Sequence, residues 1–212
     1  MLLIHQYMQK NYKTFIECIV VSAIVVFLII HFAIRRYDNG SIWELETLWG
    51  DIGYTSAIVC GLAILFNWVL WRIPFVGRWL HTPNISGEWS GKGKSSFKDT
   101  EYEFTLKISQ SFLETHVHGY FEKSRSDSFS TVFIHDDTLD RTVFVYSYQN
   151  DPKLEYRNKA EKGEEGGLNI HYGSTKLDID YADLTRLLGT YWNDRNCTGS
   201  WELTKKSKKN GK

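Results

Sequence analysis

Two long apolar runs, residues 15–34 and 52–73, limit most strongly what this chain of 212 residues can fold into. Each run holds about 20 residues, which at about 1.5 Å per residue is enough to cross a hydrocarbon core about 30 Å thick. Neither run has the regularly spaced polar positions of a helix on the surface of a soluble protein. A signal peptide is the alternative for the first run, and a buried core helix is the alternative for each. Because no small-residue cleavage site follows the first run, the sequence favours a membrane hairpin of two transmembrane helices.

The rest of the chain differs from the two runs in composition, and this difference predicts that the chain has three parts. Residues 1–80 form the membrane unit, residues 81–205 form a soluble domain of ordinary size, and residues 206–212 form a lysine-rich tail. Residues 81–204 hold 14 Lys and Arg against 20 Asp and Glu, so the soluble domain is acidic. An acidic body argues against DNA or RNA as a partner, because phosphate backbones need a basic face. Any anion site must therefore be a local pocket.

The charges around the two runs predict their orientation. Basic residues flank the hairpin on the outside, at Lys10, Lys13, Arg72 and Arg78. Acidic residues occupy the connecting loop, at Asp38, Glu44, Glu46 and Asp51, although Arg35 and Arg36 lie there too. The positive-inside rule then places both termini in the cytoplasm. The three dispersed cysteines form neither a disulfide framework nor a zinc spacing, which fits a reducing compartment.

Small residues recur every four positions along the second run, at Gly53, Ala57 and Gly61. Helical periodicity places them on one face, where another helix backbone can approach closely. This face suits either packing against the first run of the same chain or association between chains. Glu17 and His31 lie near the ends of the first run, where we expect their side chains to reach the membrane interface.

From residue 85 onward the apolar residues alternate with polar ones, as is typical of β-strands. We expect eight strands, near residues 86–94, 102–110, 113–122, 129–136, 142–149, 167–173, 186–193 and 198–205. Residues 174–185 suit either a strand or a loop, and no clear helix is expected in this part. The sequence therefore predicts an all-β, about eight-stranded antiparallel small barrel, with a β-sandwich as the alternative.

Catalytic and metal-binding motifs are weak in this sequence. It contains no G-x-S-x-G, no phosphate-binding glycine loop and no H-E-x-x-H. His116 and His118 share one strand face but have no obvious third metal ligand. Asp136, Asp137 and Asp140 suit a turn better than a calcium site. We therefore predict no enzyme activity, no cofactor and no metal site.

Three short patches combine aromatic and polar residues in a way that suggests a bound ligand. They are P-N-I-S-G-E-W at residues 83–89, Y-x-Y-x-N-x-P at residues 146–152, and G-x-Y-x-x-x-R-x-x-T-G at residues 189–199. Together with the two spans, these patches resemble the two-span, β-strand-rich effectors encoded beside cyclic-oligonucleotide synthases in bacterial CBASS anti-phage defence. The resemblance covers nearly the whole chain.

The resemblance implies a barrel that binds a cyclic di- or oligonucleotide as a regulatory ligand. It also implies spans that form homo-oligomers and disrupt the bacterial inner membrane, so that the cell dies or stops growing. In the related Panoptes type, such effectors are paired with a different cyclase, and the nucleotide restrains the effector instead of activating it. The sequence does not show whether the nucleotide would activate or restrain this protein. A membrane-tethered lipid or fatty-acid carrier and a solidly filled structural adaptor are the alternative functions.

Such a nucleotide would bring phosphates, flat bases and ribose hydroxyls into the barrel. Phosphates favour arginine, bases favour aromatic faces, and base edges favour amide or imidazole groups. We therefore expect stacking on Trp89, Tyr148 and Tyr191, edge contacts from Asn150 and His171, and phosphate or ribose contacts from Arg195 and Thr198. Arg141 and Arg186 are reserve partners for the phosphates. Alternatively, Trp89 only plugs the barrel and Arg195 only caps a turn.

Overall fold

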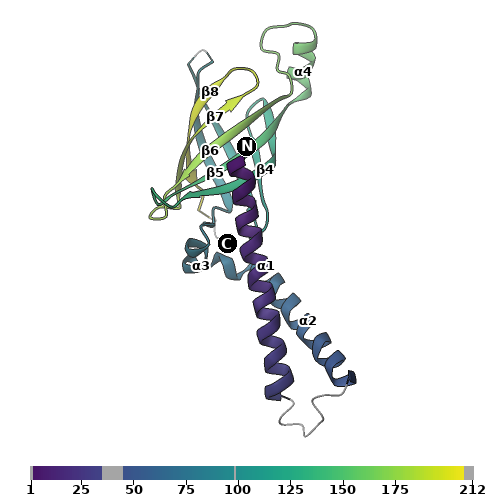
Figure 1. Cartoon of the computed structure of the whole chain (residues 1–212). Helices are drawn as coiled ribbons and strands as arrows, with labels where there is room; N and C mark the ends of the chain where they lie inside the picture. Colours follow the sequence, from purple (N-terminus) through teal and green to yellow (C-terminus); the bar gives the residue numbers. More distant parts are fainter. Residues whose placement is uncertain (1, 35–44, 98, 208–212) are drawn as a thin grey trace, which may run out of the picture. The chain divides into compact units, whose positions relative to one another are not determined.

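A computed structural model describes residues 2–34, 45–97 and 99–207 of the chain. It divides the chain into two compact units, Met1–Ile73 and Pro74–Lys212 (Figure 1). Most of the loop between the two spans lies outside the described residues, including Arg35, Arg36, Asp38 and Glu44. Most of the predicted lysine-rich tail also lies outside them.

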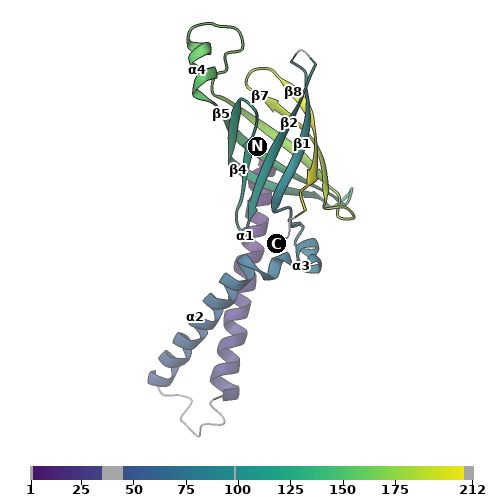
Figure 2. The same cartoon turned by 180° about the vertical axis from the view of Figure 1, so that it is seen from behind.

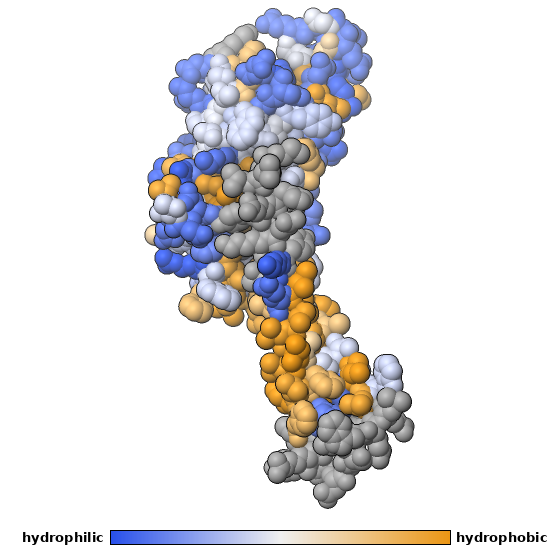
Figure 3. Space-filling view, in the orientation of Figure 1, coloured by the Kyte–Doolittle hydropathy of each residue, from blue (hydrophilic) through white to orange (hydrophobic). Residues whose placement is uncertain are grey.

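The first unit is a helical hairpin whose two arms lie side by side in both ribbon views (Figures 1 and 2). The first arm is α1, Leu2–Leu28, continued by a π-helical segment, Ile29–Ile34. The second arm is α2, Leu45–Trp68, followed by a 3-10 turn, Leu70–Arg72. The segments Phe15–Phe32 and Leu48–Arg72 are long and apolar enough to cross a membrane, and the space-filling view shows hydrophobic surface along α1 (Figure 3). The two long apolar helices of the predicted fold are therefore present.

A buried polar pair joins the two arms of the hairpin. His31 Nδ1 lies 2.9 Å from Asp51 Oδ2, and these side chains are only 3% and 1% exposed. The buried face of α2 continues one and two turns further along, at Thr55 and Val59. His31 therefore does not reach outward, as its place near the end of the run had suggested, because Asp51 provides a partner inside the hairpin. Glu17, in contrast, is exposed.

The small residues of α2 lie on a different face from this buried one. Gly53, Ala57 and Gly61 are all exposed. A Cβ atom built on either glycine would meet no other atom within 4 Å. Within the described part of the chain this face is open, so the structure does not use it for packing against the first span.

The second unit contains a closed barrel of eight antiparallel strands (Figure 2). The strands are β1 Gly87–Ser95, β2 Thr100–Gln110, β3 Thr115–Tyr120, β4 Ser124–Asp136, β5 Arg141–Pro152, β6 His171–Ile179, β7 Arg186–Asn193 and β8 Thr198–Lys205. Each strand pairs with the next in sequence, and β8 pairs with β1 to close the barrel. The predicted eight-stranded antiparallel barrel is confirmed, and the β-sandwich alternative is wrong.

Two short helices and one strand differ from the sequence-based expectation. The helix α3, Pro74–Trp79, begins with a proline, whose missing N–H costs no hydrogen bond at the first helical position. The helix α4, Leu154–Glu161, lies in the connection between β5 and β6. Because α4 and the turn after it take up this stretch, β6 begins only at His171 and includes the first half of the segment that had suited either a strand or a loop. The predicted strand at residues 167–173 was therefore placed too early.

Glycines make room for large side chains inside the barrel. Gly93 of β1 lies opposite Tyr102 of β2, and a Cβ atom on the glycine would overlap the tyrosine ring. The same pairing of a glycine with a facing bulky side chain recurs at Gly91–Phe104, Gly173–Tyr148, Gly189–Leu177 and Gly199–Tyr191. An eight-stranded barrel has an interior just wide enough for side chains, so a large group on one strand requires a small one beside it. These pairs determine which large side chains fill the interior of the barrel.

Candidate functional site

The two ends of the barrel carry different residues. We call the linker end the one formed by the start of β1, the end of β8, and the β2–β3, β4–β5 and β6–β7 turns. The far end is formed by the β1–β2, β3–β4 and β7–β8 turns and by the longer β5–β6 connection that contains α4. Six of the seven expected ligand contacts lie at the far end: Tyr148, Asn150, His171, Tyr191, Arg195 and Thr198.

Trp89 is the expected contact that the structure does not bring to this group. It lies near the start of β1, at the linker end, and its side chain is fully buried. Its indole Nε1 donates a hydrogen bond of 2.9 Å to the carbonyl oxygen of Ile85, and Lys205 Nζ lies 5.3 Å from the ring centroid. Trp89 therefore plugs the linker end, and we leave it out of the candidate site.

Tyr148 and Asn150 of β5 point into the barrel at the far end, where they are 5% exposed each. The amide oxygen of Asn150 has no hydrogen-bond partner among the described residues. A buried polar atom without a partner costs free energy, so its presence suggests a group that the protein binds. Burial raises the pKa of Tyr148 above its ordinary value, and its hydroxyl therefore stays neutral and able to donate at physiological pH.

Three aromatic side chains from β7, β8 and β2 extend this cluster. Tyr191 of β7 and Trp201 of β8 have ring centroids 5.3 Å apart, and Trp201 Nε1 donates a hydrogen bond of 2.8 Å to the hydroxyl of Tyr102. Burial also raises the pKa of Tyr102 above its ordinary value. The far end thus combines neutral hydroxyl groups with ring faces, which suits flat, polar bases. Sequence reasoning missed Tyr102 as a contact, although it continues the inward alternation of Phe104 along β2.

The β7–β8 turn brings a cation to this end of the barrel. The side-chain oxygen of Asn193 accepts hydrogen bonds of 3.1 Å from the backbone N–H groups of Arg195 and Cys197, which fixes the turn. The Arg195 side chain is exposed and forms no salt bridge with any carboxylate of the described residues. Burial, with a contribution from the charge of Arg195, lowers the pKa of His171 below its ordinary value. His171 is therefore mostly neutral at physiological pH and can both donate and accept a hydrogen bond.

The remaining expected contacts have other roles. Thr198 is exposed, and its backbone N–H donates a hydrogen bond of 3.0 Å to Ser96 Oγ, which ties two turns of the far end together. The reserve cations Arg141 and Arg186 lie at the linker end, in exposed salt bridges of 2.5 Å to Asp178 and 2.7 Å to Glu202. These two arginines are engaged elsewhere and do not reach the far-end cluster.

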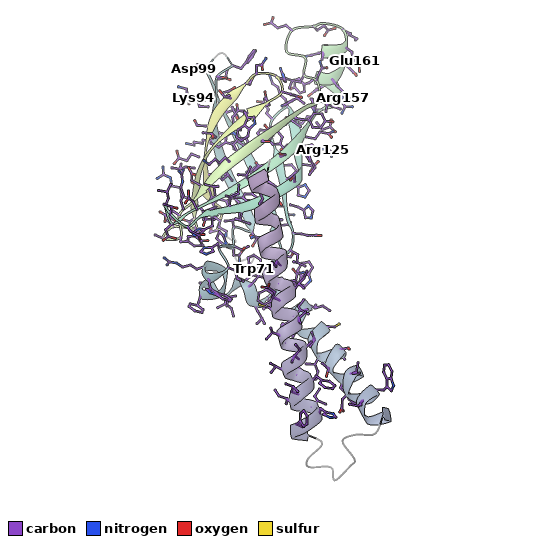
Figure 4. The ribbon with its side chains drawn as sticks, viewed as in Figure 1. Trp71, Lys94, Asp99, Arg125, Arg157 and Glu161 are labelled. Atoms are coloured by element: carbon purple, nitrogen blue, oxygen red, sulfur yellow. The ribbon has the colours of Figure 1, made fainter. Side chains whose placement is uncertain are left out.

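A large cleft of about 1160 Å³ adjoins the cluster. Tyr102 and Trp201 line it together with charged side chains of both signs that sequence reasoning did not single out: Lys92, Lys94, Lys123, Glu101, Glu103, Glu122 and Glu202. Lys94 lies 3.1 Å from Asp99 in the β1–β2 hairpin, where both are labelled in Figure 4. The cleft is somewhat larger than the range of about 300–1,000 Å³ typical of small-molecule sites. It therefore has room for a ligand the size of a nucleotide or larger.

A second, smaller cavity of about 540 Å³ lies beside the β3–β4 turn and the start of α4. Arg125 and Arg157, both labelled in Figure 4, form salt bridges with one shared carboxylate, Asp151, so this cavity keeps an excess positive charge. The Nε atom of Arg157 is buried and has no partner among the described residues. Arginine favours phosphate through paired N–H donors, so this cavity is a further place for an anionic group. No local motif in the sequence brings Arg125 and Arg157 together, because the fold creates their proximity.

Comparison with known proteins adds two findings. Residues 80–205, which include all eight strands, match the family model described as Cap15, cyclic dinucleotide receptor domain. The chain is also similar to CD-NTase-associated protein 15 of Yersinia aleksiciae, with 32% identity over 139 residues. This match covers 65% of the chain and 62% of the length of that relative.

Proposed function

The chain belongs to the Cap15 effector family of CBASS anti-phage defence, and from this premise we propose that its barrel binds a cyclic di- or oligonucleotide at the far end. The observation that carries the proposal is the grouping of unsatisfied polar and aromatic side chains at that end. The Asn150 oxygen lacks a partner, Arg195 has no salt bridge within the described residues, and Tyr191 lies at the same end of the barrel on β7. Trp89, at the opposite end, has no part in this proposal.

Each chemical part of such a ligand has a matching group at the far end. Bases stack on the rings of Tyr148 and Tyr191, a contact worth roughly 1–3 kcal/mol for each base. The Asn150 amide and the neutral imidazole of His171 bind base edges. Arg195 binds a phosphate. Because the barrel is acidic overall and the neighbouring cleft has four glutamates beside its three lysines, the contact with the phosphate has to be local.

The barrel acts as a receptor and the helical hairpin as the effector part. We place the hairpin in the bacterial inner membrane with both termini in the cytoplasm, where a nucleotide signal is made. The open face of Gly53, Ala57 and Gly61 supports association of hairpins from different chains, because small residues let helix backbones approach closely. Ligand binding shifts the population between oligomeric states, and association of the spans disrupts the membrane. Binding and assembly must then influence each other reciprocally.

The interior of the barrel argues against a lipid or fatty-acid carrier. Its centre is filled by an apolar core that includes Phe104, Phe144 and Leu177, all at most 5% exposed. An acyl chain would have to displace these side chains.

The test is membrane permeability in bacteria that express the full chain with or without a cyclic-oligonucleotide synthase. We expect dye uptake to differ between the two conditions, and the direction of the difference separates an activating from a restraining ligand. Arg195→Ala should remove the difference, whereas Arg141→Ala, at the linker end, should leave it unchanged. Dye uptake that is the same with and without every synthase tested would contradict the proposal.

A further inference from the structure

A cluster of two histidines and two aspartates lies at the linker end, away from the candidate nucleotide site. His135 is at the end of β4, Asp137 and Asp140 are in the β4–β5 turn, and His81 is in the segment between α3 and β1. Side-chain nitrogen and oxygen atoms of His81, His135 and Asp137 all lie within 4.8 Å of one another. His135 Nε2 is 3.4 Å from Asp137 Oδ1 and 3.9 Å from Asp140 Oδ1.

The contacts around His135 determine which ring nitrogen faces the cluster. His135 Nδ1 lies 2.9 Å from Thr142 Oγ1, which is itself hydrogen-bonded to the hydroxyl of Tyr181 at 3.3 Å. Nδ1 is therefore engaged on the inner side, and Nε2 is the ring atom directed at Asp137 and Asp140. A metal ion between Nε2 and the two carboxylates would be attracted by all three groups.

The two histidines and two carboxylates offer a mixed set of metal ligands. The ring of His81 stacks on that of His135 with centroids 3.6 Å apart and planes 15° from parallel. Two imidazoles beside two carboxylates form a mixed nitrogen and oxygen set, which suits Zn²⁺ and not the harder Ca²⁺ or Mg²⁺. For metal–ligand distances of about 2.0–2.1 Å in a tetrahedron, neighbouring ligand atoms lie about 3.3 Å apart. The measured 3.4 Å between His135 Nε2 and Asp137 Oδ1 fits one such edge.

The surroundings of His135 resemble those of a metal ligand in protein sites. Its side chain is only 4% exposed, and the Thr142–Tyr181 pair holds it from behind, as outer groups commonly orient a metal-binding histidine. His81 has a left-handed backbone with φ of 51°, which is costly for a residue other than glycine and holds the histidine at this place. The His81 ring has to turn out of the stack for its nitrogen to bind the same ion.

We propose that His81, His135 and Asp137, with Asp140 as a fourth ligand, form a structural Zn²⁺ site. The ion fastens the segment that leads into the barrel to the β4–β5 turn. This site differs from the sequence-based prediction, which expected no metal and considered only His116 and His118 as a histidine pair. Those two side chains lie on β3, where His118 Nδ1 is 2.5 Å from Asp127. The proposal does not depend on nucleotide binding.

The test is Zn²⁺ binding by the full chain in detergent, purified without a polyhistidine tag and stripped with EDTA. Titration with ZnCl₂ in competition with a chromogenic chelator should give one bound ion per chain. His81→Ala and Asp137→Asn lie in loops and should fold, which circular dichroism checks, and each should weaken Zn²⁺ binding at least tenfold. His118→Ala is the matched control, a histidine beside a carboxylate outside the cluster, and should change the affinity less than twofold.

Several results would overturn the Zn²⁺ site. One is the absence of saturable Zn²⁺ binding, and another is equal weakening by His118→Ala and His81→Ala. A third is binding of CaCl₂ as tightly as ZnCl₂ with no loss in His81→Ala, because calcium does not need the imidazole. A fourth is a thermal midpoint that added ZnCl₂ does not change, because an ion that binds the folded chain must raise it.

Discussion

The two ends of the barrel are built from the same eight strands but use their buried polar groups differently. At the linker end these groups are paired within the protein: Gln110 accepts a hydrogen bond from the Ile85 N–H and donates one to the Pro83 carbonyl, both 3.0 Å long. At the far end the buried oxygen of Asn150 has no partner among the described residues. This difference suggests that one end was shaped for stability and the other for binding. Substitutions at the linker end should therefore lower stability and leave ligand affinity unchanged. Substitutions at the far end should lower ligand affinity and change stability little.

The largest effect on stability should come from Trp89→Ala. Removing this fully buried ring should lower the free energy of unfolding by about 3–5 kcal/mol, because it leaves a cavity and an unpaired Ile85 carbonyl. Urea denaturation of the full chain in detergent, followed by circular dichroism, measures the loss. Trp192→Ala, which removes a half-exposed ring from β7, is the control and should cost much less. Similar losses for the two variants would mean that Trp89 is not a structural plug.

The next prediction compares the two buried amides directly. Gln110→Ala leaves a backbone N–H and a carbonyl unpaired at the linker end, at a cost of about 1–3 kcal/mol for each group. Asn150→Ala removes an oxygen without a partner and should change the free energy of unfolding by less than about 1 kcal/mol. Denaturation curves of both variants test this order. If Asn150→Ala were the more destabilising of the two, the functional assignment of the far end would lose its main support.

A smaller effect should appear in the pH dependence of stability. The pKa of His171 is lower in the folded barrel than in the unfolded chain, so the unfolded chain binds the proton more readily. The contribution of His171 is complete above its ordinary pKa of about 6.5 and is lost as the pH falls from there toward the folded value. Subtracting the stability of His171→Gln from that of the wild type between pH 5 and 8 isolates this part. A difference that grows as the pH falls would contradict the burial of this imidazole.

The smallest effect is expected at the outer surface of the linker end. Arg141→Ala breaks an exposed salt bridge to Asp178, and such pairs contribute about 0–1 kcal/mol. It should leave nucleotide affinity unchanged, since the side chain lies at the opposite end of the barrel. Ligand titration and denaturation of this variant provide the measurement. A loss of affinity would extend the binding site beyond the far end.

The fold was largely predictable because its main signals are local. The length and apolar character of residues 15–34 and 52–73 give the two helices, and alternation such as Phe104, Leu106 and Ile108 gives the inward faces of the strands. The helix α4 was missed because it carries few apolar residues and none of them is buried. Its sequence therefore lacks the periodic apolar positions by which a packed helix is recognised. The strand β6 was then placed too early in the same stretch.

The positions of the candidate residues in the fold were predictable only where one segment carries its own signal. Tyr148 and Asn150 alternate along β5 and therefore share the interior face that their spacing suggests. Trp89 was grouped with them because its motif looks similar, but which end of the barrel a residue occupies depends on strand direction and on its position along the strand. The His81–His135 stack and the Arg125–Arg157 pair join residues distant in sequence, so closure and register of the barrel had to be known first.

Nucleotide affinity of the far-end variants tests the central claim most directly. Titration calorimetry of the full chain in detergent against a panel of cyclic di- and trinucleotides should show saturable binding of at least one of them. Asn150→Ala and Arg195→Ala should each weaken that binding tenfold or more, while Arg141→Ala should bind as the wild type does. No binding by any member of the panel, or an affinity that the far-end substitutions leave unchanged, would contradict the assignment of the far end as the nucleotide site.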